Sequence, residues 1–455
     1  MTDFNSYVDP GVYIDEIVTP VISSIGSPFN SVVALVGESQ GYRSTTEQIT
    51  LTGTASVDLS NVGINVTTIT VIDRYTGATY LLTTDYTVYT DANVTAITRV
   101  GGGAIASGRD VLISYQFTNL TYYDVQAFTD YDSIRDFFGT PLTSSGTVNS
   151  PVTLAAFLAF VNGATTIVIV PVKDSNWTAA LVKSKDRLDI NVIVPVTASA
   201  AVISLAVLHV IEGEALSQLR RTFIGLDGVT STKVYTDHIS QATGAGSSRV
   251  TAVAPGSLEF FTGVGTTTIN LHGGYIAAAV AGAFASRQAS VPLTRKQIKG
   301  FTKVSSPWTE TEMILAQKNG VCVLAQQKNG KIIVRHGLTT DMSNVYTQEI
   351  SVQASKDVLV NLLQEVLEQQ NLIGSVITTE TPSYVISATA GALENAKSRA
   401  LIYNYTGLKY RQPVNQPTVI EVRFMYRPSL PLNYIQVQFS IDTQTGSAVF
   451  IEVGV

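Results

Sequence analysis

The sequence predicts a multidomain protein of mixed α/β and α+β class, with an α/β middle domain, an inserted small β-sandwich and a β-strand arm at each end. Three observations indicate this fold class. Helix-like and strand-like segments alternate between residues 123 and 290, short alternating segments rich in Thr, Val and Tyr fill 43–120, and period-two runs stand near both ends. These patterns are typical of a parallel sheet with crossover helices, of a β-sandwich and of edge strands.

The N-terminal segment 1–25 is expected to be an arm. It opens with polar residues, and a strand-like run follows Pro10-Gly11 and is closed by Pro20. The run consists of Val12, Tyr13, Ile14, Asp15, Glu16, Ile17 and Val18. Because chain ends fray unless something holds them, this strand needs a sheet to join. The sequence leaves open whether that sheet belongs to its own chain or to a neighbouring subunit.

An α/β domain is predicted over 26–42 and 121–290, and it is interrupted by a β-sandwich at 43–120. The apolar run from Ser31 to Gly37 is typical of a fully buried strand. The composition then changes to short alternating segments separated by turn residues. Beyond them, helices expected at 130–138, 153–161, 200–220 and 275–289 alternate with strand-like runs at 166–170, 190–194 and 222–224. This order favours a largely parallel sheet.

The segment 291–432 is predicted to be a C-terminal core domain that mixes strands and helices. An Asn-Gly pair at 329–330 lies between two apolar runs and predicts a hairpin, because both residue types tolerate positive φ. Apolar residues at helical spacing predict a helix around 356–367, and a second helix is expected at 390–402. A strand-like run follows at 420–426.

The last segment, 433–455, is expected to form two strands and the second arm. Apolar and polar residues alternate without a miss from 433 to 442, and another alternating run follows a turn at 445–447. The apolar side chains of the two runs are Ile435, Val437, Phe439, Ile441, Val449, Ile451, Val453 and Val455. About four buried aliphatic side chains per arm, at about 1.5–3 kcal/mol each, are substantial against the entropy of ordering a free arm.

Composition excludes several classes of protein. With 45% hydrophobic and only 14% charged residues, the chain is expected to have large buried or interfacial surfaces. A net charge of −6 argues against direct binding to nucleic acid, which depends on neutralising phosphate charge. The start of the chain lacks a signal-peptide pattern, and the apolar stretch 275–285 is shorter than the roughly 20 residues that span a bilayer. We expect folding in a reducing cytoplasm, no membrane insertion, and a buried free thiol at Cys322, the single cysteine.

No catalytic, cofactor-binding or metal-binding residue is predicted. The glycines at 101–103 precede a strand and not a helix, so they lack the context of a dinucleotide site. His209, His238, His272 and His336 are far apart, and none has a second ligand at helical or hairpin spacing. Neither a phosphate-loop motif nor a nucleophile elbow occurs in the sequence. The chain is therefore expected to be no enzyme and to need no cofactor.

Several segments, taken in order, resemble one known family. They are Pro10 to Ile17, Val33 to Glu38, Val253 to Gly256, Gly337 to Thr340 and Pro428 to Ile435. Together they resemble the contractile tail sheath proteins of myovirus-type bacteriophages, and the resemblance covers nearly all of the chain except the β insertion. It implies a structural subunit of the virion tail that is assembled in the host bacterial cytoplasm and polymerises around a tail tube. Contraction then drives the tube through the host envelope for genome ejection.

The resemblance also implies partners and interface residues. Copies are expected to stack as hexameric rings tied by exchanged arms, and to contact the tail tube protein, the baseplate and the tail terminator protein. The segment 291–432 becomes the sheath core domain of the inner layer, with the α/β part and the β insertion outside it. The residues expected between subunits are Val12, Tyr13, Ile14, Ile17, Val437, Phe439, Ile441, Val449, Ile451 and Val453.

Other functions stay open on the sequence. The sheath of a contractile bacteriocin or an extracellular injection system has the same sequence features, and genome context separates it from a virus. A soluble enzyme with an immunoglobulin-like domain is opposed by the missing motifs. An adhesive or carbohydrate-binding role of the β insertion rests on its tyrosines, which include Tyr75, Tyr80, Tyr86 and Tyr89, although tyrosine in strands is more often a packing residue.

Overall fold

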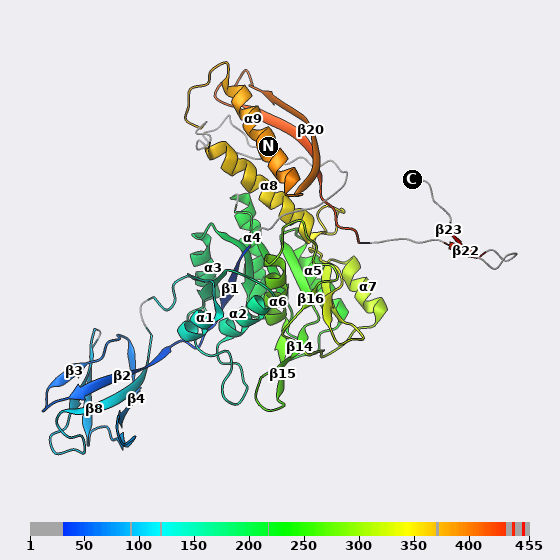
Figure 1. Ribbon diagram of the computed structural model, residues 1–455. Coiled ribbons are helices and arrows are strands. Elements are labelled where there is room, and N and C mark those ends of the chain that lie inside the picture. Colours follow the sequence, from blue (N-terminus) through cyan, green and yellow to red (C-terminus); the bar gives the residue numbers. More distant parts are fainter. Residues whose placement is uncertain are drawn as a thin grey trace. The chain divides into compact units, whose positions relative to one another are not determined.

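The computed structural model describes residues 31–91, 93–118, 121–216, 218–369, 373–433, 439–441 and 448–450. These residues fall into two compact units. The body contains the described residues up to 288 together with 295–353. The C-terminal unit contains 289–294 and the described residues from 354 onward. Figure 1 shows the helices and strands of both units.

The body is built on a nine-stranded sheet with the order β16-β19-β18-β13-β12-β11-β1-β10-β9. Its strands are β1 (Val32–Gly37), β9 (Gln126–Phe128), β10 (Ile167–Pro171), β11 (Ile190–Pro195), β12 (Arg221–Gly225), β13 (Val250–Ala254), β16 (Gln297–Ile298), β18 (Val321–Gln326) and β19 (Ile332–Val334). The strands from β18 to β10 are parallel to one another, as the apolar runs predict. The sheet continues past residue 290, because β16, β18 and β19 belong to the segment 291–432.

Helices cover both faces of this sheet (Figure 1). One layer holds α2 (Pro151–Val161) and α6 (Gly273–Ala285), and the other holds α3 (Trp177–Lys185), α4 (Ala200–Ala215), α5 (Tyr235–Ala245) and α7 (Glu310–Lys318). Strand β12 shows the division, because successive side chains of a strand point to opposite faces. Phe223 lies against Phe284 of α6, with ring centroids 5.6 Å apart, whereas Ile224 joins the cluster formed with α4, α5 and α7. The short helix α1 (Tyr131–Phe138) packs on α2.

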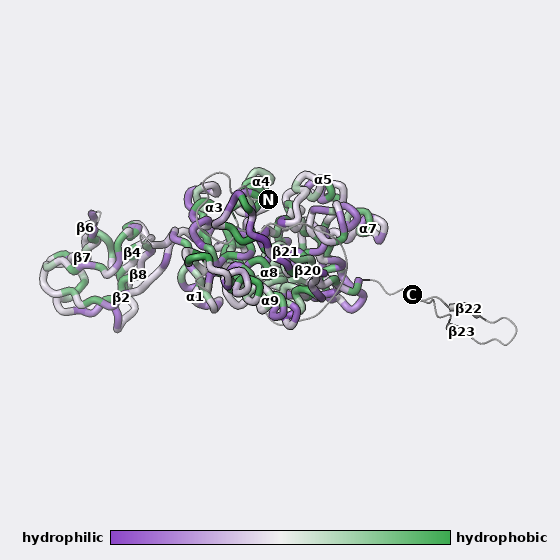
Figure 2. Tube along the Cα trace, turned by 90° about the horizontal axis from the view of Figure 1, so that it is seen from above, coloured by the Kyte–Doolittle hydropathy of each residue, from purple (hydrophilic) through white to green (hydrophobic). Residues whose placement is uncertain are grey.

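Several helices have bounds that differ from the sequence prediction. The helix expected at 275–289 is α6, which ends at Ala285, and the helix expected around 356–367 is α8 (Ile350–Gln369). The helix expected at 200–220 ends at Ala215, so that Arg220 lies outside it. The residues of α4 from Ala200 to Ile211 are mostly apolar, and Figure 2 shows the hydropathy of this helix by colour. The helix expected at 390–402 is α9 (Thr381–Ser398), which begins earlier because Pro382 fits the first turn of a helix. The hairpin predicted at Asn329-Gly330 joins β18 to β19, and Gly330 has a φ of 82°.

The insertion consists of two small sheets with one shared core. Sheet β2-β8-β4-β5 and sheet β3-β7-β6 enclose an apolar cluster that includes Val71, Ile97 and Ile113. The strands are β2 (Arg43–Leu51), β3 (Ser56–Asp58), β4 (Ile64–Asp73), β5 (Thr79–Tyr80), β6 (Tyr86–Thr90), β7 (Thr95–Arg99) and β8 (Arg109–Phe117). Its first and last strands pair, with Arg43 opposite Phe117. The chain therefore enters and leaves the insertion at neighbouring positions.

A three-stranded antiparallel sheet, β15-β14-β17, completes the body. Its strands are β14 (Ser257–Phe261), β15 (Thr268–His272) and β17 (Lys303–Val304). The sequence pattern does not predict this sheet. The turn between its first two strands, 262–267, carries glycines with positive φ and no Asn-Gly or Asp-Gly pair, so the usual hairpin signal is missing.

The C-terminal unit pairs helices with two small antiparallel sheets. Its elements are α8 (Ile350–Gln369), α9 (Thr381–Ser398), β20 (Ile402–Arg411), β21 (Glu421–Pro428), β22 (Phe439–Ile441) and β23 (Ala448–Phe450). Strands β20 and β21 pair as a two-stranded ribbon, and α9 packs on β20. Strands β22 and β23 pair with each other, with Phe439 opposite Phe450. Neither pair has a third strand among the described residues.

Candidate functional site

In an open parallel α/β sheet, a ligand site is expected at the carboxyl ends of the strands. In doubly wound sheets with β1 between the second and third strands, ligands bind beside β1 at the carboxyl ends of the strands. Here β1 lies between β10 and β11, so the same position falls beside Gly37 and Pro195. A crevice there is the fold-level expectation for an enzyme or a nucleotide-binding protein.

Side chains fill this position, because a Cβ placed on Gly37 would lie 2.9 Å from Cβ of Val196 and 3.0 Å from Cγ1 of Val152 in α2. The N-terminus of α6 closes the neighbouring ends of β11 and β12. A Cβ placed on Gly225 would lie 2.5 Å from the carbonyl oxygen of Gly273, and one placed on Gly274 would lie 2.7 Å from the amide nitrogen of Thr197. The imidazole Nδ1 of His272 accepts a hydrogen bond from the Gly274 amide at 3.1 Å. Backbone therefore packs on backbone at the carboxyl ends of β11 and β12, and Gly225 and Gly274 leave no space there for a side chain. The arrangement is structural and not a phosphate cradle.

Reactive side chains of the body are buried in unreactive forms. Cys322 is fully buried in β18, and burial raises the pKa of its thiol to about 12, so it stays protonated and is a poor nucleophile. Burial likewise lowers the pKa of His238 to about 4. Among the described residues, no group of three or more His, Cys, Asp or Glu side chains is arranged to hold a metal ion. No helix among them is long and apolar enough to span a membrane.

A buried arginine closes the end of α3. The guanidinium of Arg220 donates to the carbonyl oxygens of Ser184, Lys185 and Arg187 at 3.0, 3.2 and 2.7 Å. The last carbonyls of a helix have no partner within the helix, and a cation there also complements the helix dipole. His209 lies 3.3 Å from the same guanidinium, and burial, followed by the charge of Arg220, lowers the pKa of His209 to about 4. This cluster stabilises the α3 and α4 layer.

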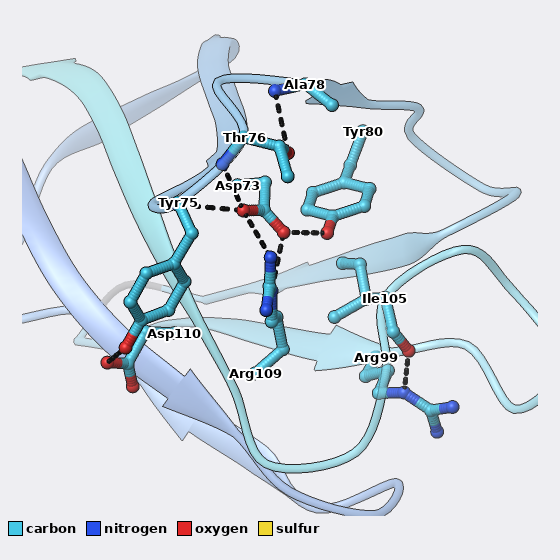
Figure 3. A network of polar contacts seen from close by, with 9 residues as sticks. All are labelled: Asp73, Tyr75, Thr76, Ala78, Tyr80, Arg99, Ile105, Arg109 and Asp110. Atoms are coloured by element: carbon cyan, nitrogen blue, oxygen red, sulfur yellow. Dashed lines mark hydrogen bonds and ion pairs between the residues drawn. The ribbon is translucent and has the colours of Figure 1, made fainter.

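A polar network in the insertion fixes one exposed aromatic ring (Figure 3). Asp73 accepts two hydrogen bonds from Arg109, at 2.6 and 2.8 Å, and one from the Tyr80 hydroxyl at 2.6 Å. The Arg109 guanidinium, and next the Tyr80 hydroxyl, hold the pKa of the Asp73 carboxyl well below its usual range. Tyr75 lies over Arg109 at 4.7 Å and donates to Asp110 at 3.1 Å. The network ties the β4–β5 turn to β8.

The insertion tyrosines divide between packing and exposure. Tyr86 is 3% exposed and belongs to the core, and Tyr80 is half-buried and hydrogen-bonded to Asp73. Tyr75 and Tyr89 are 65% and 60% exposed. The four rings therefore do not form one stacking platform, and two of them are the packing residues that tyrosine usually provides in strands.

The predicted interface residues are only partly within the described residues. Val12, Tyr13, Ile14, Ile17, Val437, Ile451 and Val453 lie outside them. Phe439 and Ile441 belong to β22 and Val449 to β23, and these strands form the hairpin that the alternation predicts. Within the described residues this hairpin pairs with no further strand. A two-stranded hairpin is marginal alone in water, so it suits a strand donor.

The ribbon formed by β20 and β21 is only half visible in the sequence. Only its second strand was predicted, because an irregularity between Thr406 and Lys409 shifts the alternation of β20 by one residue. The C-terminal unit around it exposes many large apolar side chains: Ile373, Val376, Tyr384, Tyr403, Tyr410, Val414, Met425 and Leu432.

Comparison with known proteins points to one family. The model of the phage tail sheath protein central domain matches residues 146–340. The tail sheath protein of Mycobacterium phage Bxz1 is 34% identical over 407 residues, which are 85% of this chain and 70% of that protein. The tail sheath protein of Bacillus phage SP01 is 26% identical over 273 residues, which are 58% of this chain and 45% of that protein.

Solved structures share the fold at low sequence identity. The anti-feeding prophage helical sheath in its contracted state has a TM-score of 0.59 and 12% identity, covering 96% of this chain and 100% of that one. The contracted sheath complex of an extracellular contractile injection system, PVC, has a TM-score of 0.55 and 12% identity, covering 97% of this chain and 99% of that one. This mixed α/β fold with several sheets is therefore one that sheath subunits adopt.

Proposed function

Because this chain belongs to the phage tail sheath protein family, we propose that its copies polymerise around the tail tube and contract to drive the tube through the host cell envelope for genome ejection. The chain is a structural subunit of a contractile phage tail, not an enzyme, and it is located in the virion tail. The resemblance found in the sequence is confirmed by these relatives.

Exchange of the terminal arms holds the polymer together in this proposal. The observation that carries it is the β22–β23 hairpin, which has no third strand among the described residues. The β20–β21 ribbon is equally unextended there and is the proposed acceptor, because strand addition supplies backbone hydrogen bonds at an open edge. The donor side chains are those predicted above: Val12, Tyr13, Ile14, Ile17, Val437, Phe439, Ile441, Val449, Ile451 and Val453.

Exchanged arms suit contraction because they keep neighbours linked while folded bodies rotate and form new contacts. We infer stacked hexameric rings, with the tail tube protein, the baseplate and the tail terminator protein as partners. The segment 291–432 and the arms form the inner layer, and the α/β part over 26–42 and 121–290 and the insertion lie outside it. A phage-derived injection particle is the alternative setting, and capsid and terminase genes beside this one would exclude it.

A chain that lacks residues 1–25 and is cut after Ser440 is expected to stay folded and to form neither tubes nor rings. The full chain, at the same high concentration, forms them, because only it carries both donor strands. Negative-stain electron microscopy compares the two, and circular dichroism checks folding. If neither assembles, the comparison is repeated on purified tail tubes, which only the full chain should coat. Tubes from both chains would reject arm exchange.

Replacing residues 44–116 by a short glycine linker is expected to leave polymerisation intact. Arg43 and Phe117 are paired, and directly opposed residues of an antiparallel pair have Cα atoms only about 4.5–5.5 Å apart, so the linker closes the body without strain. Sedimentation and electron microscopy measure assembly against the full chain. A folded variant that no longer assembles would mean that the insertion belongs to the subunit interface.

A further inference from the structure

The β20–β21 ribbon has one apolar and one charged face. Tyr405 and Tyr426 are opposite each other, and the Tyr405 hydroxyl is hydrogen-bonded to Glu394 of α9. This face therefore lies against the helix. Val422 and Phe424 alternate with Tyr426 along β21, so they lie on the same face, and both are half-buried. The other face follows the alternate residues of both strands: Asn404, Thr406, Lys409, Arg411, Glu421, Arg423, Met425 and Arg427.

The charged face is strongly basic for so small a surface. It carries four basic side chains and one acidic one, so its net charge is +3. Glu421 is shared by Arg411, at 2.6 and 3.0 Å, and Arg423, at 3.1 Å. Lys409 is directly opposite Arg423, and like charges opposite each other destabilise a strand pair. An acidic partner on this face relieves that repulsion.

The chain itself contains two acidic segments of suitable length. Residues 1–25 hold Asp3, Asp9, Asp15 and Glu16 with no Lys or Arg, a net side-chain charge of −4. Residues 433–455 hold Asp442 and Glu452 with no Lys or Arg, a net side-chain charge of −2. Both terminal segments thus carry acidic side chains and no basic ones, whereas the charged face of the ribbon has a net positive charge. The net charge of the whole chain, −6, does not explain why acidic and basic side chains are separated in this way.

The alternation of the arms matches that of the ribbon. In the C-terminal run, Val437, Phe439 and Ile441 share one side and Asp442 lies on the other. A strand with this pattern, added at an edge of the ribbon, continues the apolar face with its apolar side. Its polar side then lies beside the basic residues. The N-terminal run alternates less strictly, because Asp15 lies on the other side from Val12 and Ile14 but on the same side as Tyr13 and Ile17.

We propose that the basic face of the β20–β21 ribbon selects the acidic terminal segments of a second copy, so that opposite charge guides each arm into its acceptor. This inference rests on the strand exchange proposed above and adds the chemistry that chooses the site. Complementary charge raises the rate of encounter and suppresses wrong partners more than it raises affinity. Exposed charge pairs are screened within about 8–10 Å at ordinary ionic strength. Assembly is therefore expected to slow by about tenfold between low and high salt.

The test reverses charge on each side in turn. A ribbon variant, Lys409→Glu with Arg423→Glu, and an arm variant, Asp15→Lys with Glu16→Lys, are expected to assemble at least about tenfold more slowly than the unmodified chain. An equimolar mixture of the two recovers the rate, because each acidic ribbon meets a basic arm. Light scattering follows assembly, and electron microscopy identifies the product.

Two further variants separate charge from folding and from net charge. Lys409→Gln with Arg423→Gln removes the opposed cations without adding repulsion, and the assembly of this variant should depend less on salt than that of the unmodified chain. Lys328→Glu with Lys331→Glu changes two exposed lysines of the β18–β19 hairpin by the same amount and should assemble normally. Circular dichroism and thermal unfolding confirm that each variant is folded.

The outcomes distinguish this inference from the strand exchange itself. If deletion of residues 1–25 abolishes assembly while folded ribbon and arm variants assemble at the normal rate, exchange stands and charge selection is overturned. Slow assembly of the β18–β19 control overturns it as well, because net charge alone then explains the loss. If the chain that lacks residues 1–25 assembles normally, exchange of the N-terminal arm is rejected, and with it the charge selection of that arm. A ribbon variant that assembles alone but fails to coat tail tubes assigns the face to the tube and not to the arm.

Discussion

Gly282→Ala is expected to lower the free energy of unfolding of the body by about 3 kcal/mol, near the upper end of what one extra buried methyl costs. Gly282 lies in α6, all of whose residues are buried, where the helix packs on α2. A Cβ at this position would lie 2.3 Å from the carbonyl oxygen of Ala159 and 2.6 Å from its Cα. Both are backbone atoms, so relief requires the two helices to move apart.

Gly244→Ala is the matched control. It also lies in a helix of the body, but a Cβ there meets nothing within 4 Å. Ala is favoured over Gly inside helices by about 0.5–1 kcal/mol, so this variant should be neutral or more stable. Hydrogen exchange of the body's strands measures both, since a chain of two units need not unfold in one step. Equal protection in the two variants would contradict close packing of α2 on α6.

Arg220→Ala is expected to destabilise the body by about 3 kcal/mol or more. The side chain is 1% exposed and satisfies three carbonyl oxygens at the end of α3. Its removal takes one hydrogen bond from each of these oxygens, leaves each with a weaker second donor, and also creates a cavity. Arg220→Lys should lower the free energy of unfolding by an intermediate amount, because an ammonium group cannot reproduce the planar set of donors of a guanidinium.

Arg135→Ala separates this effect from the general loss of an arginine. Arg135 pairs with Asp132 and Asp136 at 2.8 and 3.0 Å, but its side chain is 41% exposed. Surface pairs of this kind contribute about 0–1 kcal/mol. Thermal unfolding and hydrogen exchange around 184–187 measure the difference. Similar losses in Arg135→Ala and Arg220→Ala would show that the buried cap does not stabilise α3.

The parallel sheet was predictable because its strands are buried on both faces and read as continuous apolar runs. Val33 to Val36 and Ile167 to Val170 are fully buried, as their composition indicates. The β22–β23 hairpin was predictable for the opposite reason, because its residues alternate strictly. In both cases one strand carries its own signal, and no distant residue is needed to recognise it.

Features that depend on distant residues were not predictable from one sequence. Gly225 packs closely on Gly273 at the carboxyl end of β12, but the two glycines lie in separate elements and carry no motif. Arg220 was assigned to a helix, since only the folded chain brings it to the carbonyls of 184–187. Strand β20 was hidden by its own irregularity, which breaks the period on which recognition depends.

The sole cysteine has a practical consequence for observing contraction. Cys322 is fully buried, and burial raises the pKa of its thiol to about 12, so it does not compete for maleimide reagents while the protein is folded. A cysteine introduced at an exposed position of the insertion is then the only reactive one, without any change to the native core. A dye pair placed in this way on neighbouring subunits would report contraction of single sheaths as a change in energy transfer.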